Sequence, residues 1–172
     1  MKKIVILTTG GTIEKAYNEL EGSLDVSEFL IKSFVLDKLR LPYTQYELRP
    51  LMAKDSLTMV EKDRQVICQA IHDQWKKEKT PILVVHGTDT MELTAAYCYE
   101  HLNHPPAPVV FTGSMKPIGF EDTDGKQNIT EALMACKLLA PGIYVSFHGE
   151  VFQVPNVTKD RKERTFTKKS SS

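Results

Sequence analysis

Three polar loops of this sequence carry side chains and backbone groups that suit binding of a small ligand. They are Thr8-Thr9-Gly10-Gly11-Thr12, His86-Gly87-Thr88-Asp89-Thr90 and Thr112-Gly113-Ser114-Met115-Lys116. Paired glycines let the backbone turn sharply and bring its N–H groups close to a ligand, with Thr12 pointing toward it. The phosphate-binding patterns G-x-G-x-x-G and G-x-x-x-x-G-K-[ST] are both missing, so we do not expect a phosphate loop.

Each loop also has a purely structural interpretation. The Gly10-Gly11 turn can be a tight turn whose threonine hydroxyls satisfy nearby backbone groups. In the second loop, Thr88, Asp89 or Thr90 can act only as the cap of a following helix, whose unpaired N–H groups point toward it. Three oxygen-bearing side chains crowd that one helix start, where one would suffice. This favours a functional role for the loop.

The elements that must position these loops are short apolar runs alternating with amphipathic stretches. The runs are expected to be buried, mostly parallel strands, and they lie at 4–7, 46–48, 82–85, 109–111 and 143–145. Helical spacing predicts helices over 58–79, 91–102 and 129–140, with Thr58 and Glu61 forming a capping box, and a further helix over 27–38. The sequence therefore predicts an α/β fold with three layers, an open and mostly parallel sheet with helices on both faces. In such folds ligands bind at the carboxyl ends of the strands, where all three loops fall.

Composition limits the class of partner. The 172 residues include 22 Lys plus Arg and 22 Asp plus Glu, so the overall charge does not favour nucleic acid or a membrane surface. Cys68, Cys98 and Cys136 fall in helical patterns without C-x-x-C spacing, which predicts reduced core thiols. The apolar run that begins at Ile4 is too short for a signal peptide. We expect a cytoplasmic protein with a small-molecule substrate.

At this point several segments, taken together, resemble the L-asparaginase family and its glutaminase and transfer-RNA amidotransferase relatives. The segments Thr9–Ile13 and His86–Met91 look like two signature loops of that family. Gly113–Pro117 and Asp124–Asn128 resemble the next loop, and Val157–Lys159 resembles its lysine-bearing segment. Only the amino-terminal half of the family pattern is present. The resemblance implies one catalytic domain over residues 1–168, followed by a disordered tail at 169–172.

The resemblance implies hydrolysis of a side-chain amide by a threonine hydroxyl. Carried onto this chain, Thr12 is the expected nucleophile, and Thr88, Asp89 and Lys159 form a second set that activates a hydroxyl or water. Without the resemblance, Lys159 would be interpreted as a solvated residue of a basic tail. Tyr17 is expected to accept the proton of the nucleophile from a mobile loop, although an exposed loop tyrosine is more often incidental.

The expected substrate-binding residues are Gly11, Asp55, Ser56 and Ser114, together with Thr88 and Asp89. The chain departs from the family at Ala53-Lys54, where the ligand-binding pair is expected. Lys54 offers a positive charge for a carboxylate, or it is a surface lysine. We expect neither a metal nor an organic cofactor.

The leading hypothesis is an amidohydrolase that converts L-asparagine, or a similar small amide, to L-aspartate and ammonia. Two alternatives remain: a non-catalytic module that binds an amino acid, and an ammonia-supplying subunit of an amidotransferase. Two-domain relatives are roughly twice as long and complete each site with a neighbouring subunit. We therefore expect a homo-oligomer, a homodimer, in which self-association encloses the site.

Overall fold

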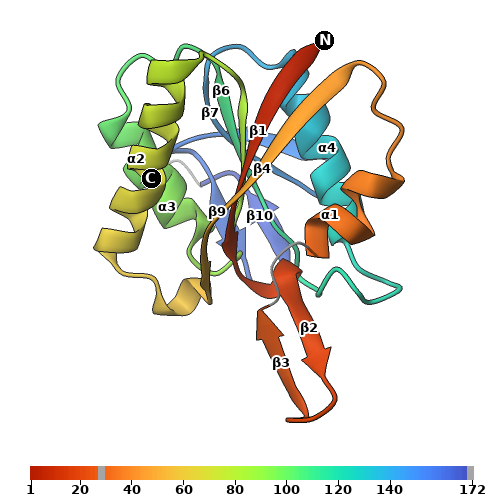
Figure 1. Cartoon of the computed structure of the whole chain (residues 1–172). Helices are drawn as coiled ribbons and strands as arrows, with labels where there is room; N and C mark the ends of the chain where they lie inside the picture. Colours follow the sequence, from red (N-terminus) through yellow and green to blue (C-terminus); the bar gives the residue numbers. More distant parts are fainter. Residues whose placement is uncertain (27–29, 170–172) are drawn as a thin grey trace.

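A six-stranded sheet forms the centre of the protein, in the order β4-β1-β5-β6-β7-β8 (Figure 1). The computed structural model describes residues 1–26 and 30–169. The strands are β1 (Lys2–Gly10), β4 (Thr44–Lys54), β5 (Ile82–Val85), β6 (Pro108–Thr112), β7 (Gly142–Phe147) and β8 (Glu150–Gln153). All neighbouring pairs are parallel except β7 with β8. The predicted mostly parallel sheet is confirmed.

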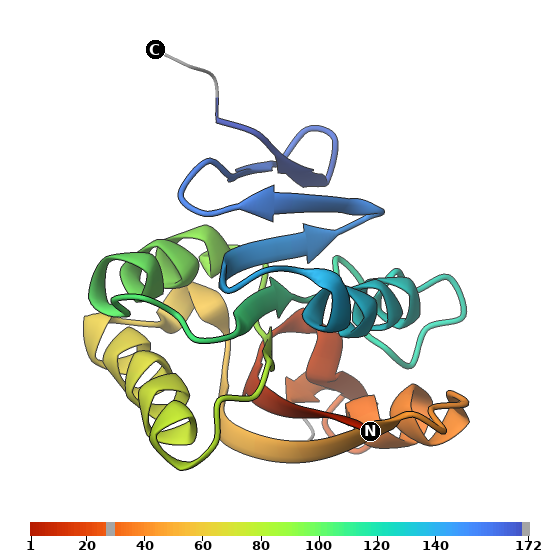
Figure 2. The same ribbon diagram turned by 90° about the horizontal axis from the view of Figure 1, so that it is seen from above.

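Helices cover both faces of this sheet, as Figure 2 shows from above. They are α1 (Leu30–Phe34), α2 (Glu61–Lys77), α3 (Met91–His101) and α4 (Gly125–Leu138). Alternating side chains of β1 separate into two cores: Val5 and Leu7 pack on the side of α2 and α3, whereas Ile4 and Ile6 pack on the side of α1 and α4. Both cores are almost fully buried. The predicted three-layer α/β fold is confirmed.

Strand and helix ends differ from the prediction where local contacts compete. The expected capping box of Thr58 and Glu61 is wrong. Thr58 ends a short 3-10 helix (Ser56–Thr58) and its hydroxyl donates to Asp55 O, so α2 begins only at Glu61. Val60 is the N-cap of α2, and the Asp63 side chain accepts its backbone N–H at 2.9 Å, as the third helical residue does in a capping box. The strand expected at 46–48 runs from Thr44 to Lys54, because it pairs along almost the whole of β1.

The helix predicted over 27–38 is shorter and broken. Within the described residues, α1 ends at Phe34 and a 3-10 helix follows at Leu36–Lys38. Residues 27–29 lie outside the described part of the chain. The three cysteines lie buried in α2, α3 and α4 as free thiols, as predicted.

Two small hairpins were not predicted. The strands β2 (Lys15–Asn18) and β3 (Ser23–Val26) form one, which projects from the domain in Figure 1. The strands β9 (Thr158–Asp160) and β10 (Thr165–Thr167) form the other. In the part of the chain that the structure describes, no helix is long and apolar enough to cross a membrane.

Candidate active site

Lys159 reaches from β9 to the loop between β5 and α3. Its Nζ lies 2.7 Å from Thr88 Oγ1 and 2.9 Å from Asp89 Oδ1. The lysine side chain is only 12% exposed and that of Asp89 is 26% exposed. The solvated basic tail considered from the sequence therefore does not describe this lysine. An ammonium meets a hydroxyl and a carboxylate that lie about 70 residues away from it in the chain.

The charge state of Asp89 follows from its neighbours. Burial acts to raise the pKa of this carboxyl, but hydrogen bonds and charge from Lys159 and Arg161 outweigh burial and hold the pKa below its ordinary value. The Arg161 Nη1 atom lies 3.0 Å from the same Oδ1, on a side chain that is 67% exposed. Asp89 is therefore an anion at neutral pH and fixes the lysine beside Thr88.

The local fold explains why Thr88 and Asp89 occupy this place. The strand β5 ends at Val85 and α3 starts at Met91, so the intervening turn must reverse direction at the carboxyl edge of the sheet. Thr90 is the N-cap, as the sequence allowed, but its hydroxyl accepts no N–H of its own helix and instead donates to Ser56 O at 2.8 Å. The cap residue thus ties the β5–α3 turn to the end of β4, and it leaves Thr88 and Asp89 to face β9.

His86 stabilises the β5–α3 turn from the protein interior. Its ring is fully buried, with Nδ1 2.8 Å from Gly87 O and Nε2 2.9 Å from Thr94 Oγ1. Burial lowers the pKa of this imidazole to about 4, so the ring is neutral at physiological pH. It joins the turn to α3 and is too deeply buried to contact a ligand at the surface.

The first polar loop packs directly on the second. Gly11 has φ +84°, and a Cβ built on it would lie 2.5 Å from Gly87 Cα. The Gly11 N–H also donates to Lys54 O at 2.9 Å. Thr12 and Thr88 each follow one residue after this contact. Within the described residues, no hydrogen bond joins the Thr12 side chain to Thr88, Asp89 or Lys159.

Tyr17 lies on β2 and is 63% exposed. Its hairpin is tied to the domain by Lys15, whose Nζ lies 2.9 Å from Asp55 Oδ2. The hydrogen bond from Lys15 and another from Leu57 N hold the pKa of Asp55 below its ordinary value. The hairpin is therefore tied to the residue that follows β4, while Tyr17 remains largely exposed.

The remaining expected binding residues are held by local bonds. Ser56 is buried below Gly87, because a Cβ on that glycine would come within 2.5 Å of Ser56 Oγ. Lys54 pairs with Asp63 of α2 at 2.7 Å, so its charge is already partnered. The Ser114 hydroxyl donates to Lys116 O within its own loop. Ser56 lies behind Gly87, and Lys54 lies beside Gly11, whose N–H it accepts through its carbonyl oxygen.

Several neighbours of the site were missed from the sequence. Glu92 Oε2 accepts the backbone N–H of Lys159 at 2.7 Å, and the Met115 sulfur lies 3.7 Å from Thr88 Oγ1. Arg161 follows Lys159 by two residues but lies just beyond the end of β9, so strand alternation did not predict its contact with Asp89. No local signal exists for Glu92 or Met115 either.

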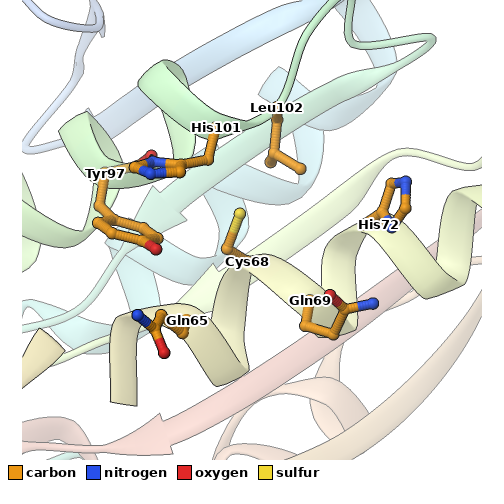
Figure 3. Close-up of a pocket in the computed structure, with 7 residues that line it drawn as sticks. All are labelled: Gln65, Cys68, Gln69, His72, Tyr97, His101 and Leu102. Atoms are coloured by element: carbon orange, nitrogen blue, oxygen red, sulfur yellow. The ribbon is translucent and has the colours of Figure 1, made fainter. Parts of the chain in front are cut away.

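A cleft of about 420 Å³ lies elsewhere, between α2 and α3. Figure 3 shows the stacked rings of Tyr97 and His101 to one side of Cys68 there, and the ring centroids are 3.9 Å apart. It lies at the end of α3 furthest from Thr88 and contains no residue of the site described above. Among the described residues, no group of three or more His, Cys, Asp or Glu side chains is arranged to hold a metal ion.

Comparison with known proteins assigns the domain. Residues 3–171 match the family described as the asparaginase amino-terminal domain. The chain belongs to the asparaginase family. Over 159 residues this asparaginase-family domain is 31% identical to an L-asparaginase of Thermococcus kodakarensis, covering 91% of the chain and 47% of that protein. It is 28% identical over 154 residues to a glutamyl-tRNA(Gln) amidotransferase component of Methanococcus vannielii, covering 88% of the chain and 35% of that protein.

The solved structures agree with the family. The thermostable L-asparaginase of T. kodakarensis superposes with a TM-score of 0.88 at 30% identity, covering 96% of this chain and 51% of that one. This asparaginase-family domain thus spans about half the length of that relative. The predicted resemblance to the amino-terminal half of the family is confirmed.

Proposed function

We propose that this domain hydrolyses the side-chain amide of L-asparagine, or of a similar small amide, to the carboxylate and ammonia. The observation that carries this proposal is the contact of Lys159 Nζ with Thr88 Oγ1 at 2.7 Å, braced by Asp89. Membership of the asparaginase family supports an amide as the substrate class.

In the proposed reaction the Thr12 hydroxyl attacks the amide carbon and its proton passes to a neighbouring base. Tyr17 is the proposed acceptor, which requires the β2–β3 hairpin to bring its exposed ring over the crevice. The negative charge that develops on the carbonyl oxygen is stabilised by backbone N–H groups of Thr12 and of the Thr88 turn, because the Gly11 N–H is already used by Lys54 O. The proton taken from Thr12 is then delivered to the amide nitrogen, so that ammonia leaves as the intermediate collapses and an ester between the acyl group and Thr12 remains.

Water then hydrolyses the ester. We assign the activation of this water, or of a hydroxyl, to Thr88 and Lys159, because a lysine in contact with a hydroxyl can exchange a proton with it. Asp89 orients the lysine and, as an anion, grips the ammonium group of an amino-acid substrate. Gly11, Asp55, Ser56 and Ser114 are the remaining proposed substrate-binding residues. No metal or organic cofactor enters this scheme.

The test is ammonia release from L-asparagine, L-glutamine and other small amides. The wild-type protein is compared with the double variant Thr12→Ala plus Thr88→Ala, which removes both hydroxyls and leaves the Lys159–Asp89 pair. Hydrolysis of at least one amide above that control supports the proposal. Equal rates for the two proteins reject it.

A non-catalytic amino-acid-binding module is the second candidate, because no hydrogen bond among the described residues joins the Thr12 side chain to Thr88, Asp89 or Lys159. It predicts that calorimetry detects binding of asparagine or aspartate while no ammonia appears.

Similarity to a component of an amidotransferase supports a third candidate, the ammonia-supplying subunit. That role predicts a partner protein in a pull-down and ammonia release that depends on it. We further propose that the domain is cytoplasmic. We also propose that it forms a homodimer that encloses the site, and analytical sedimentation tests this oligomeric state directly.

A further inference from the structure

The turn between β7 and β8 holds an unusual residue. It consists of His148 and Gly149, whose φ angles are both positive, at 49° and 82°. Turns of this kind favour Asn or Asp before Gly, because these residues adopt the left-handed conformation most easily. A histidine in this position suggests that its side chain makes a contact that asparagine cannot make.

The imidazole of His148 bridges two partners. Its Nε2 lies 2.9 Å from Asp124 Oδ2 and its Nδ1 lies 3.0 Å from Thr165 Oγ1. A carboxylate only accepts hydrogen bonds, so Nε2 carries a proton, and in the neutral ring Nδ1 accepts from the Thr165 hydroxyl. The backbone N–H of His148 donates to Asn128 Oδ1 at 3.1 Å, which fixes the turn on α4.

On one side the bridge leads to the loop after β6. Asp124 accepts the backbone N–H groups of Met115 and Lys116 at 2.9–3.1 Å. Met115 in turn places its sulfur 3.7 Å from Thr88 Oγ1. Asp124 is only 17% exposed. The carboxylate therefore fixes one of the segments that contact Thr88.

On the other side the bridge leads to the hairpin that carries Lys159. Thr165 lies on β10 and pairs with Asp160, the residue after Lys159. Each strand of this hairpin has only three residues, and an isolated two-stranded hairpin is marginally stable at best. Its place against the domain must therefore come from contacts outside the ladder.

Besides the site itself, the buried Phe166 of β10 anchors the hairpin in the core that also holds Phe147 and Val157. The backbone N–H of Lys159 donates to Glu92 Oε2, and the rings of Phe166 and Phe147 pack edge to face at 5.0 Å. The third anchor is the hydrogen bond between Thr165 and His148. It is the one that also connects the hairpin to the Met115 loop. The Met115 loop and the β9–β10 hairpin, which both contact the Thr88 hydroxyl, are thus joined through the imidazole ring of His148.

We propose that His148 is a positioning residue for the reaction, bridging Asp124 and Thr165 so that Lys159 and Met115 keep their places around Thr88. This inference rests on the proposed amide hydrolysis for its effect on rate. The geometry itself makes a prediction that is independent of activity, namely that the bridge holds β9.

The test uses two variants that break the bridge and one that keeps it. His148→Asn suits the left-handed turn but is too short to reach both partners, and Thr165→Val removes the hydroxyl while keeping the side-chain shape. Thr165→Ser retains the hydroxyl. We expect kcat to fall about 10- to 100-fold in the first two, because small displacements of a catalytic group carry such costs. KM should change less than about 2-fold, since the bridge does not touch the substrate.

Amide hydrogen exchange gives the readout that does not need turnover. The backbone N–H of Lys159 should exchange faster in His148→Asn and Thr165→Val than in the wild type, while Thr165→Ser should match the wild type and the core of β5 should be unchanged. If the wild type releases no ammonia, the proposed function fails and exchange alone decides the positioning role. Unchanged exchange and kcat in both bridge-breaking variants, or equal acceleration across the whole domain, would overturn it.

Discussion

Replacing Gly11 with alanine should damage both stability and the proposed activity. Gly11 has φ +84° and ψ −175°, a backbone region that is essentially restricted to glycine. The added methyl group would also lie 2.5 Å from Gly87 Cα and 2.7 Å from Gly87 N. Both obstacles are backbone atoms, so no side chain can rotate away to make room.

The expected cost has two parts. The unfavourable dihedral angles cost about 1–3 kcal/mol, and overpacking in a tight contact costs about 1–3 kcal/mol more. Together they predict a loss of roughly 2–6 kcal/mol from a domain stability that is typically about 5–15 kcal/mol. Relief of the clash would push the Gly11 turn away from Gly87, so Thr12 would move away from Thr88 and ammonia release should fall with it.

Gly22 supplies a matched control, because its φ is +66° but a Cβ there would meet nothing within 4 Å. Gly22→Ala should therefore show the dihedral cost alone, about 1–2 kcal/mol. The assay is urea denaturation of both variants and the wild type, followed by fluorescence of the single tryptophan. If Gly11→Ala is no more destabilising than Gly22→Ala, the argument that Gly11 and Gly87 bring the two loops together is wrong.

Three further predictions concern charge. Lys159→Met should lower kcat for ammonia release about 10²- to 10⁴-fold, whereas the exposed neighbour Lys162→Met should leave it unchanged; equal loss in both would contradict the role of Lys159. Asp89 has a lowered pKa, so its stabilisation is complete above the ordinary value of 3.8 and is lost as pH falls below it. The stability difference between wild type and Asp89→Asn in urea titrations should therefore shrink under acid, and a gap that widens under acid would refute this. His86 stays neutral down to a pKa of about 4 instead of 6.5, so acidification through that window should cost about 3 kcal/mol of stability. NMR titration of its ring should give a midpoint near 4, and a midpoint near 6.5 would show that the ring is not buried as described.

Local pattern predicted the parts of the fold that depend on burial. The runs at 4–7, 82–85 and 109–111 are apolar because both faces of a parallel strand are covered, and their spacing from helices defined the layers. The polar loops at Gly11 and Thr88 could be placed at one edge of the sheet, since carboxyl ends of parallel strands meet there.

Element ends and small hairpins did not follow from the sequence. Thr58 has the residue type of a helix cap, yet its hydroxyl is used by Asp55 O and α2 starts later. The β9–β10 hairpin has three-residue strands, too short for an alternating pattern to be recognised. Its contacts with the domain include the hydrogen bond from Lys159 N to Glu92, a residue remote in the chain.

The sequence by itself determined the layered α/β architecture and the types of chemical group available at its edge, because burial and periodicity are local properties of the chain. Residue spacing did not decide which groups meet: the family resemblance implied that Thr88, Asp89 and Lys159 form one set, and the tertiary structure brings them into contact. Lys159 has the surroundings of a basic tail in the sequence, and its ammonium reaches Thr88 because a short hairpin folds back across about 70 residues. Contacts between segments so far apart depend on the packing of the whole domain, which residue spacing does not encode.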